Sequence, residues 1–468
     1  MAKSGESLKT VLIVGAGLLL MVFMGIFVAL FGATVGEHYG ILLALPVAMI
    51  IGILFFYDRY FLFFLIILSR SSIDQLLDAT RLGSFGLGAV INALVILLAI
   101  IGIFERPNPV RKALKQTWLP FLIVIVFGLL IAPDKLLAVK TFLSLLSYAS
   151  IFALALVLIK TNEDYVKWIR AVFYSSIIPV LYAFVDIAHG GSIRQESEGF
   201  RIASTFSHPN VFAFYLVLMI SLGFYFFKSK SIHLPGFVRK TLPFYILVMM
   251  GLLILTKTRS AWGACFFYFS MYAIIYERKY LVYILLAPIL GLMVPEIRER
   301  FMDLAQGNEA INNAKLNSYA WRKLIWESGF NYMQPIHYIY GYGLDAFRHF
   351  SKTFFSMSND TELAAHNVYV QLFFDTGAIG IASFVWLYGR VVSLLIPFYK
   401  KNKLMVFSAI MFVLEFAFEC YSDNMLGYLG LNWYLWFVLG AAYAVNYSDN
   451  DKGQESKKES SPGKSIVA

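Results

Sequence analysis

The sequence predicts an all-α polytopic membrane protein with about fourteen transmembrane helices. The chain of 468 residues is 59% hydrophobic and only 15% charged, whereas a soluble protein carries about 25% charged residues. The apolar residues come in blocks of about 20, the length that crosses a bilayer as a helix. Because lipid offers no hydrogen bonds, every backbone N–H and C=O must be satisfied within its own segment, and the blocks are therefore helices.

The predicted spans follow the apolar runs along the chain. The first run follows Lys3 and Lys9 and is too long for the core of a signal peptide, so we interpret it as an uncleaved span. The third run is short enough to be broken or tilted. The spans are 11–31, 40–57, 60–70, 87–104, 118–133, 140–159, 168–188, 210–227, 242–256, 259–276, 280–294, 378–399, 404–422 and 429–446.

Lysine and arginine clusters in short connections orient these spans, because such clusters stay on the cytoplasmic side. With both termini cytoplasmic, all four clusters obey this rule. They lie at 106–115, 228–240, 278–279 and 400–403. The predicted organisation is N-terminal transmembrane helices (1–294), a large helical cap loop on the outer side (295–365), C-terminal transmembrane helices (366–447) and a disordered cytoplasmic tail (448–468).

Several classes of function are disfavoured. The net charge is +10, and the positive residues lie in short loops between spans, where they set the topology. No nucleic acid partner is therefore expected. Cys265 and Cys420 lie in apolar spans and are interpreted as inert core thiols. The chain has no cluster of histidines and cysteines at metal-ligand spacing, so neither a metal nor another cofactor is expected. An inverted-repeat transporter finds no support, because no internal repeat is apparent.

Cations gather on the outer side, against the topological bias. Arg201 precedes a helix start at Pro209, and arginine binds phosphate oxygens through two parallel hydrogen bonds. Lys257 and Arg259 occupy a tight turn between two spans, where an anion anchored in the membrane would explain them. The structural alternatives are an ion pair between Arg201 and Glu196 or Glu198, and anchoring of the turn with Lys257 and Arg259 to lipid headgroups.

The cap loop contributes Arg322, and the turn Gly341-Tyr342-Gly343 is typical of a backbone that approaches a ligand or another helix. His366 follows the cap, on the expected first turn of a helix. Imidazole is the usual general base for a hydroxyl, although a lone histidine at a helix start also serves as a cap or packs at an interface. Of the other histidines, His208 is the best competitor because it also faces outward.

Glu415 and Glu419 share one helical face, and Asp423 follows four residues later. Carboxylates inside a membrane are costly and usually face a partner or a cavity. We expect them to pair with the outer cations; a proton path is the alternative.

Together these motifs resemble the O-antigen polymerase and ligase superfamily. The resemblance covers roughly residues 195–385, and it is carried by the order of the motifs and the large loop before the histidine. One departure is Ala203-Ser204, where many members have glycine. The motifs are Arg201 with Thr205-Phe206-x-His208-Pro209-Asn210, Thr258-Arg259-Ser260-Ala261-Trp262, Arg322-x3-Trp326 with Pro335 and Gly341-Tyr342-Gly343-x3-Phe347, and His366-Asn367-x-Tyr369-x-Gln371 with Asp375-x-Gly377-x2-Gly380.

The resemblance implies a membrane glycosyltransferase of the C-type class, inverting and metal-independent, in the bacterial inner membrane with its active site on the periplasmic side. It implies an undecaprenyl-diphosphate-linked glycan donor and a glycan or lipid-linked acceptor, with a chain-length regulator as a further partner. By analogy, His366 activates the acceptor hydroxyl, while Arg201, Arg259 and Arg322 bind the diphosphate. The supporting residues are Lys257, His208, Asn210, Tyr342, Asn367, Tyr369 and Gln371.

The favoured function is polymerisation of lipid-linked repeat units of O-antigen or exopolysaccharide. A ligase that attaches the glycan to lipid A core is the alternative within the class, followed by a protein-glycosylating transferase. A transporter of lipid-linked oligosaccharides is the alternative from another class, but it would place its polar site near the bilayer midplane. A non-catalytic assembly protein is the last alternative.

Overall fold

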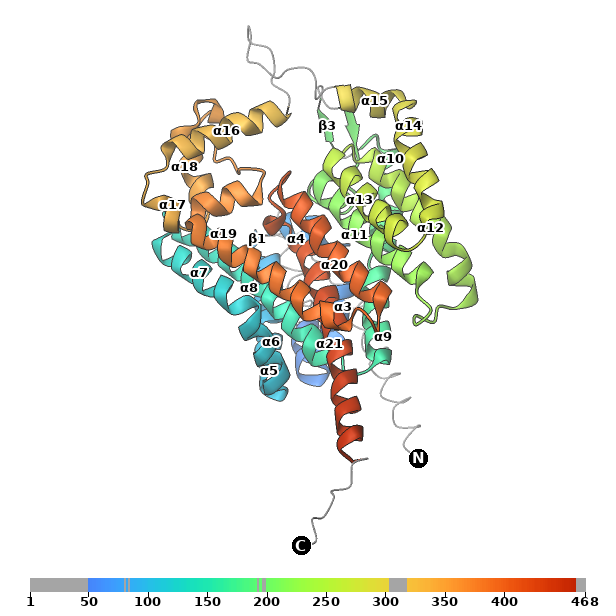
Figure 1. The fold of residues 1–468 in the computed structure, drawn as a ribbon. Helices are drawn as coiled ribbons and strands as arrows, with labels where there is room; N and C mark the ends of the chain where they lie inside the picture. The colour runs from blue at the N-terminus through green and yellow to red at the C-terminus, as the bar shows by residue number, and fades with distance from the viewer. Residues whose placement is uncertain are drawn as a thin grey trace, which may run out of the picture.

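The computed structural model describes residues 49–79, 81–82, 85–191, 193–195, 199–302 and 318–459 (Figure 1). The first predicted span (11–31), the first half of the second (40–48), and residues 303–317 of the predicted cap lie outside these ranges. Residues 49–57 are helical. The remaining helices are α3 (Arg59–Ser69), α4 (Asp74–Ala79), α5 (Leu87–Glu105), α6 (Pro107–Gln116), α7 (Trp118–Ile131), α8 (Lys135–Leu158), α9 (Asn162–Tyr174), α10 (Ile177–Ala188), α11 (Pro209–Lys228), α12 (Gly236–Leu255), α13 (Arg259–Ile275), α14 (Leu281–Leu292), α15 (Pro295–Met302), α16 (Ser318–Tyr332), α17 (His337–Tyr340), α18 (Ala346–Phe354), α19 (Val368–Leu395), α20 (Lys403–Cys420) and α21 (Leu429–Glu459).

The all-helical prediction is confirmed across the described residues, apart from two short antiparallel strand pairs. β1 (Arg81–Leu82) pairs with β2 (Phe85–Gly86), and β3 (Ile193–Gln195) pairs with β4 (Gly199–Arg201). Each predicted span from residue 60 onward coincides with one helix or with the consecutive helices α9 and α10. α21 continues beyond the predicted span into the polar segment as far as Glu459.

Fewer helices than predicted are long and apolar enough to cross a membrane. The described residues hold 6 such helices, or 7 if α6 and α7, bent by 62° at their junction, form one broken span. The difference has a physical origin: α13 and α14 have only 17 and 12 residues, and α20 carries Lys403, Glu415 and Glu419 within 18 residues. The chain is therefore an apolar helical protein of membrane type, and the count of fourteen spans is not confirmed.

The core is centred on α8, α11 and α21, and α8 packs against both α5 and α21. α11 is apolar all round, and nearly every residue from Pro209 to Phe226 is buried, as expected for a helix enclosed by others. Trp118 and Trp436, both fully buried, pack against each other with ring centroids 4.3 Å apart and ring planes tilted by 56°. In Figure 1, α20 and α21 run through the middle of the molecule.

The described part of the predicted cap folds as helices α15 to α18. α16 and α18 enclose a small separate core that includes Ile325, Phe347 and Phe374. In Figure 1, α16 and α18 gather above α19, whereas α15 lies beside α14 on the opposite side of the molecule. The cap is thus joined to α19 by its own apolar cluster.

The turn predicted at Gly341 approaches another helix. Gly341 has φ +71° and Gly377, inside α19, has φ +65°; a Cβ on either glycine would lie 2.3 Å from the backbone that faces it. Gly377 also interrupts the helical backbone of α19. Only glycine permits this crossing, which fixes where the cap meets α19 and so where the chain before α19 lies.

Candidate functional site

Four separate segments converge on Asp423, which follows the end of α20. Asp423 is 2% exposed. One carboxylate oxygen, Oδ1, lies 3.1 Å from His366 Nδ1, and the other accepts from Asn210 Nδ2 at 2.6 Å. Burial alone would raise the pKa of this carboxyl, but hydrogen bonds from His366 and Asn210 and the charges of His366 and Arg322 hold it well below its usual range. Asp423 is therefore an ionised, buried carboxylate.

His366 does not lie on the first turn of a helix as predicted. It has φ 48° in the left-handed region, and α19 begins at Val368 after an Asn367 cap. This turn aims the imidazole at Asp423. Because that carboxylate is ionised, His366 Nδ1 is the donor, and in the neutral form of the ring the lone pair is on Nε2. The His366 side chain is 43% exposed, so it has a partner on one edge and an open surface on the other.

Arg201 and Asn210 extend the network. Arg201 is 7% exposed; its Nε donates to the Thr256 carbonyl at 2.8 Å, and its Nη2 donates to Asn210 Oδ1 at 2.7 Å and Thr258 Oγ1 at 3.1 Å. Asn210 thus accepts from Arg201 and donates to Asp423. A continuous hydrogen-bonded chain runs from Arg201 to His366, although 165 residues (366 − 201) separate them in sequence.

The backbone beside Arg201 forms a left-handed turn although it has Ala203-Ser204 where a glycine was expected. Ser204 has φ 54°, a conformation that costs a non-glycine residue energy. Asp186 Oδ2 accepts from the backbone N–H of both Ala203 and Ser204, at 2.9 and 3.0 Å, and Ser204 Oγ donates to the Pro179 carbonyl at 2.6 Å. These bonds hold the strained turn that presents Arg201.

The other predicted cations lie around this network. Arg259 opens α13 and its Nη2 donates to Ser318 Oγ at 3.1 Å, which links the α12–α13 turn to the cap. Lys257 is half-buried in the same turn and has φ 54°. Arg322, half-buried on α16, is close enough for its charge to lower the pKa of Asp423. The charge of Arg322 therefore acts on the buried carboxylate, and Arg259 connects its own turn to α16, the helix that carries Arg322.

A cavity of about 260 Å³ opens beside His366 and Asp423. Since a water molecule occupies about 30 Å³ of the liquid, the cavity accommodates a group the size of several waters. His208 lines it, and its Nδ1 accepts from the Asn210 backbone N–H at 3.1 Å, as the cap of α11. Arg70 and Asp74 line the opposite wall, paired at 2.5 Å.

Arg70 and Asp74 were missed by the sequence reasoning. Arg70 is 5% exposed at the end of α3, and its guanidinium lies over the Trp433 ring, 5.6 Å from the centroid. Opposite charges four residues apart at the end of an apolar run were the available signal. Their position makes Arg70 a further cation at the cavity.

The supporting residues differ in their placement. Gln371 Oε1 accepts from the Ala365 backbone and from Asn424, and Asn367 caps α19, so both hold the His366 turn. Tyr369 instead donates to the Ala417 carbonyl between helices. Tyr342 lies in the cap core, stacked on His337 with centroids 3.7 Å apart. The last two do not contact the network.

The expected pairing of the carboxylates with outer cations holds only for Asp423. Glu415 accepts from Ser221 Oγ at 3.0 Å, and Glu419 Oε1 has no hydrogen-bond partner among the described residues. Both are 3% exposed. Glu419 and Glu415 lie four and eight residues before Asp423 in the last turns of α20. Over the described ranges, no group of three or more His, Cys, Asp or Glu side chains could hold a metal ion.

Comparison with known proteins gives a family match for part of the chain. The model of the family described as O-antigen ligase matches residues 244–385, the segment that carries Arg259, Arg322 and His366. A search of curated proteins finds no match. The family match confirms the resemblance that the order of the motifs indicates: residues 244–385 of this chain are similar to the O-antigen ligase family.

Proposed function

We propose that this protein is a membrane glycosyltransferase that polymerises repeat units of O-antigen or exopolysaccharide, with an undecaprenyl-diphosphate-linked glycan as donor. The observation that carries the proposal is the pair formed by His366 and the buried carboxylate of Asp423. An imidazole held on one edge by a carboxylate, with its other nitrogen exposed, has the arrangement of a general base. The family match supports the class of reaction.

The proposed step is an inverting transfer. His366 Nε2 takes the proton of the acceptor hydroxyl while its oxygen forms a bond to the anomeric carbon of the donor sugar. The bond from that carbon to the diphosphate oxygen breaks, and its electron pair leaves with the diphosphate. Asp423 stabilises the imidazolium that forms and keeps Nε2 facing the acceptor. No metal takes part.

Arginines are proposed to hold the diphosphate. Arg259 and Arg322 are half-buried rather than enclosed. Arg201, whose donors already engage Thr256, Thr258 and Asn210, is fixed in orientation by them. Positive charge at these positions opposes the charge that grows on the leaving group.

We place the site on the periplasmic side of the inner membrane, with both termini in the cytoplasm. The candidate residues occur at helix ends, in the turns before α11, α13 and α19 and after α20. The basic connections around Lys228 and Arg278 follow the opposite ends of α11 and α13. This arrangement favours an enzyme over a transporter with a midplane site.

The test replaces the chain in cells with His366→Ala or Arg259→Ala variants. At normal membrane abundance we expect loss of polymer, by about a hundredfold or more for the base. Accumulation of single lipid-linked repeat units supports a polymerase, whereas long unattached lipid-linked glycan supports a ligase. His189→Ala, an exposed histidine at the end of α10, is the matched control. Full polymer from both site variants contradicts the assignment.

A further inference from the structure

A second and larger cavity, of about 930 Å³, lies between α3, α9, α10 and the connection from α11 to α12. α11 begins in the candidate site at His208 and has 20 residues, which span about 30 Å. The chain then reaches Ser231 and His233, which line this cavity. The cavity is therefore at the opposite end of α11 from the network of Asp423. In Figure 1, α9 lies far from the cap helices α16 and α18.

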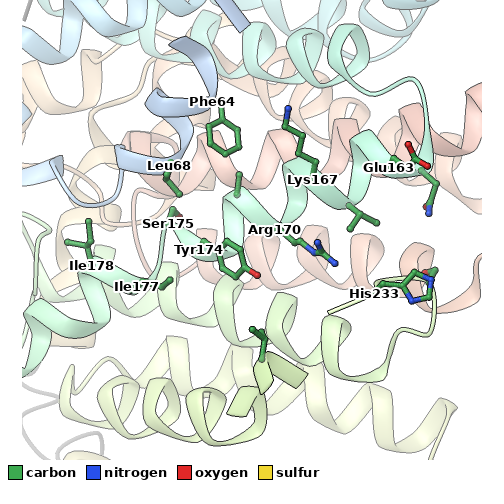
Figure 2. Close-up of a pocket in the computed structure, with 15 residues that line it drawn as sticks. Phe64, Leu68, Glu163, Lys167, Arg170, Tyr174, Ser175, Ile177, Ile178 and His233 are labelled. Carbon is green, nitrogen blue, oxygen red and sulfur yellow. The ribbon is translucent and has the colours of Figure 1, made fainter. Parts of the chain in front are cut away.

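The cavity has an apolar part and a polar end. Figure 2 shows Leu68, Ile177 and Ile178 at one end and Glu163 and His233 at the other. Ile177 and Ile178 are 45% and 56% exposed, so the apolar part opens sideways from the helices. In a membrane such an opening faces acyl chains.

Three charged side chains of α9 line the cavity: Glu163 at the polar end, and Lys167 and Arg170 in the middle (Figure 2). Glu163, Lys167 and Arg170 are spaced four and three residues apart, and such spacing puts them on one helix face. Glu163 is in the first turn of α9, where the helix dipole stabilises a carboxylate. Two cations and one anion leave a net charge of +1 along this face of α9.

Arg170 is the group that requires a partner. It lies about two turns inside α9, and its Nε is buried with no hydrogen-bond partner among the residues described. A buried guanidinium N–H without an acceptor is costly. Lys167 Nζ lies 5.9 Å from the Phe64 ring centroid, so its stem follows the cavity wall. A phosphate oxygen at this position would satisfy Arg170, and arginine suits such an acceptor.

We propose that this cavity binds an anionic phospholipid, with its phosphate at Arg170 and Lys167 and its acyl chains along Leu68 and Ile178. The net charge of +1 matches a phosphodiester headgroup that carries one negative charge. The mainly apolar wall selects a lipid over a free phosphate ion, and the site is independent of the proposed glycosyl transfer.

The experiment is native mass spectrometry of the full-length protein with equimolar dioleoyl-phosphatidylglycerol and dioleoyl-phosphatidylcholine. We expect the wild type to retain phosphatidylglycerol about fivefold or more over phosphatidylcholine, and the double variant K167Q/R170Q to lose this excess. The double variant R239Q/K240Q removes two exposed cations from α12 that do not line the cavity, and it should keep the excess. Equal retention of both lipids by the wild type, or an unchanged excess in K167Q/R170Q, overturns the proposal.

A second variant tests the apolar part and does not depend on the charges. Leu68→Trp fills the space that we assign to acyl chains and leaves both cations in place, so it should lower retention of phosphatidylglycerol. Size-exclusion profiles matched to the wild type verify folding. Unchanged retention in Leu68→Trp, or displacement of the lipid by millimolar inorganic phosphate, would point to a simple anion site and would overturn the assignment to a lipid.

Discussion

Three carboxylates follow one another at four-residue intervals, two on α20 and one just beyond it, yet their surroundings differ completely. Asp423 accepts from His366 and Asn210 and lies in the field of Arg322. Glu415 accepts from one serine hydroxyl, and Glu419 Oε1 has no hydrogen-bond partner in the described ranges. All three are nearly fully buried, so burial does not distinguish them.

The three carboxylates differ in the cations and hydrogen-bond donors that lie close to each of them. Asp423 lies where turns from distant parts of the chain meet, and such turns bring cations and amide donors. Glu419 and Glu415 lie about one and two turns deeper, among apolar helix faces such as those of Phe214 and Leu435. A buried charge needs several partners to offset its lost hydration. Asp423 can therefore act as a charged group, whereas the two glutamates have no comparable support.

The largest effect is expected when the charge of Asp423 is removed. Asp423→Asn keeps the size of the side chain, but an amide does not hold the His366 tautomer or stabilise the imidazolium. Polymer yield at matched membrane abundance should fall by about a hundredfold or more. The double variant with His366→Ala should be no worse than either single variant, because the two residues act as one unit. Additive losses would show that Asp423 acts independently of His366.

A smaller effect is expected at Asn210, which connects Arg201 to Asp423. Asn210→Ala removes the acceptor of Arg201 Nη2 and one donor to Asp423, and leaves the direct contact of His366 intact. Loss of hydrogen bonds to charged groups costs about 1.5–3 kcal/mol, so we expect product to fall by about tenfold or more. Measurement of product at equal abundance checks this. Wild-type yield would mean that the contact between Arg201 and Asn210 does not support the site.

The ionised state of Asp423 also predicts how stability depends on pH. Its pKa is lower in the folded protein than in the unfolded chain. This contribution is therefore present above about pH 4, the unfolded value, and is lost as pH falls through the folded value. Asp423→Asn lacks it. The gap in Tm between wild type and Asp423→Asn in detergent, worth about 1–3 kcal/mol near neutral pH, should narrow below about pH 4. A constant gap from pH 7 to pH 3 contradicts the assignment.

The helices could be predicted from the sequence because apolar length is a local property. The runs at 87–104 and 210–227 correspond to α5 and α11 within a few residues. The count of fourteen membrane spans is not confirmed, because it includes short or charged helices such as α14 and α20 as full spans. Whether a short helix crosses a bilayer depends on its neighbours, and its own sequence does not carry that information.

The site was predictable in its residue types and less so in its contacts. Arg201, Asn210 and His366 stood out because polar groups beside apolar runs are conspicuous. The partner of His366 was not predicted, because the pairing with Asp423 joins turns that are 57 residues apart in the sequence. The left-handed turn at Ser204, which Asp186 holds, was not predicted either. Many members of the family have glycine there, and their motif carries no information on how a serine adopts this conformation.

The smallest effect is expected at Glu419. Glu419→Gln preserves the shape of the side chain and removes only its capacity for charge, and no cation pairs with this carboxyl among the described residues. Stability should change by about 0.5 kcal/mol or less, and polymer yield should match that of the wild type. Glu415→Gln is the matched control, since glutamine can still accept from Ser221. Loss of product in Glu419→Gln at normal abundance and Tm would assign this carboxyl a part in proton movement through α20, and the contrast with Asp423 would then be one of function rather than of support.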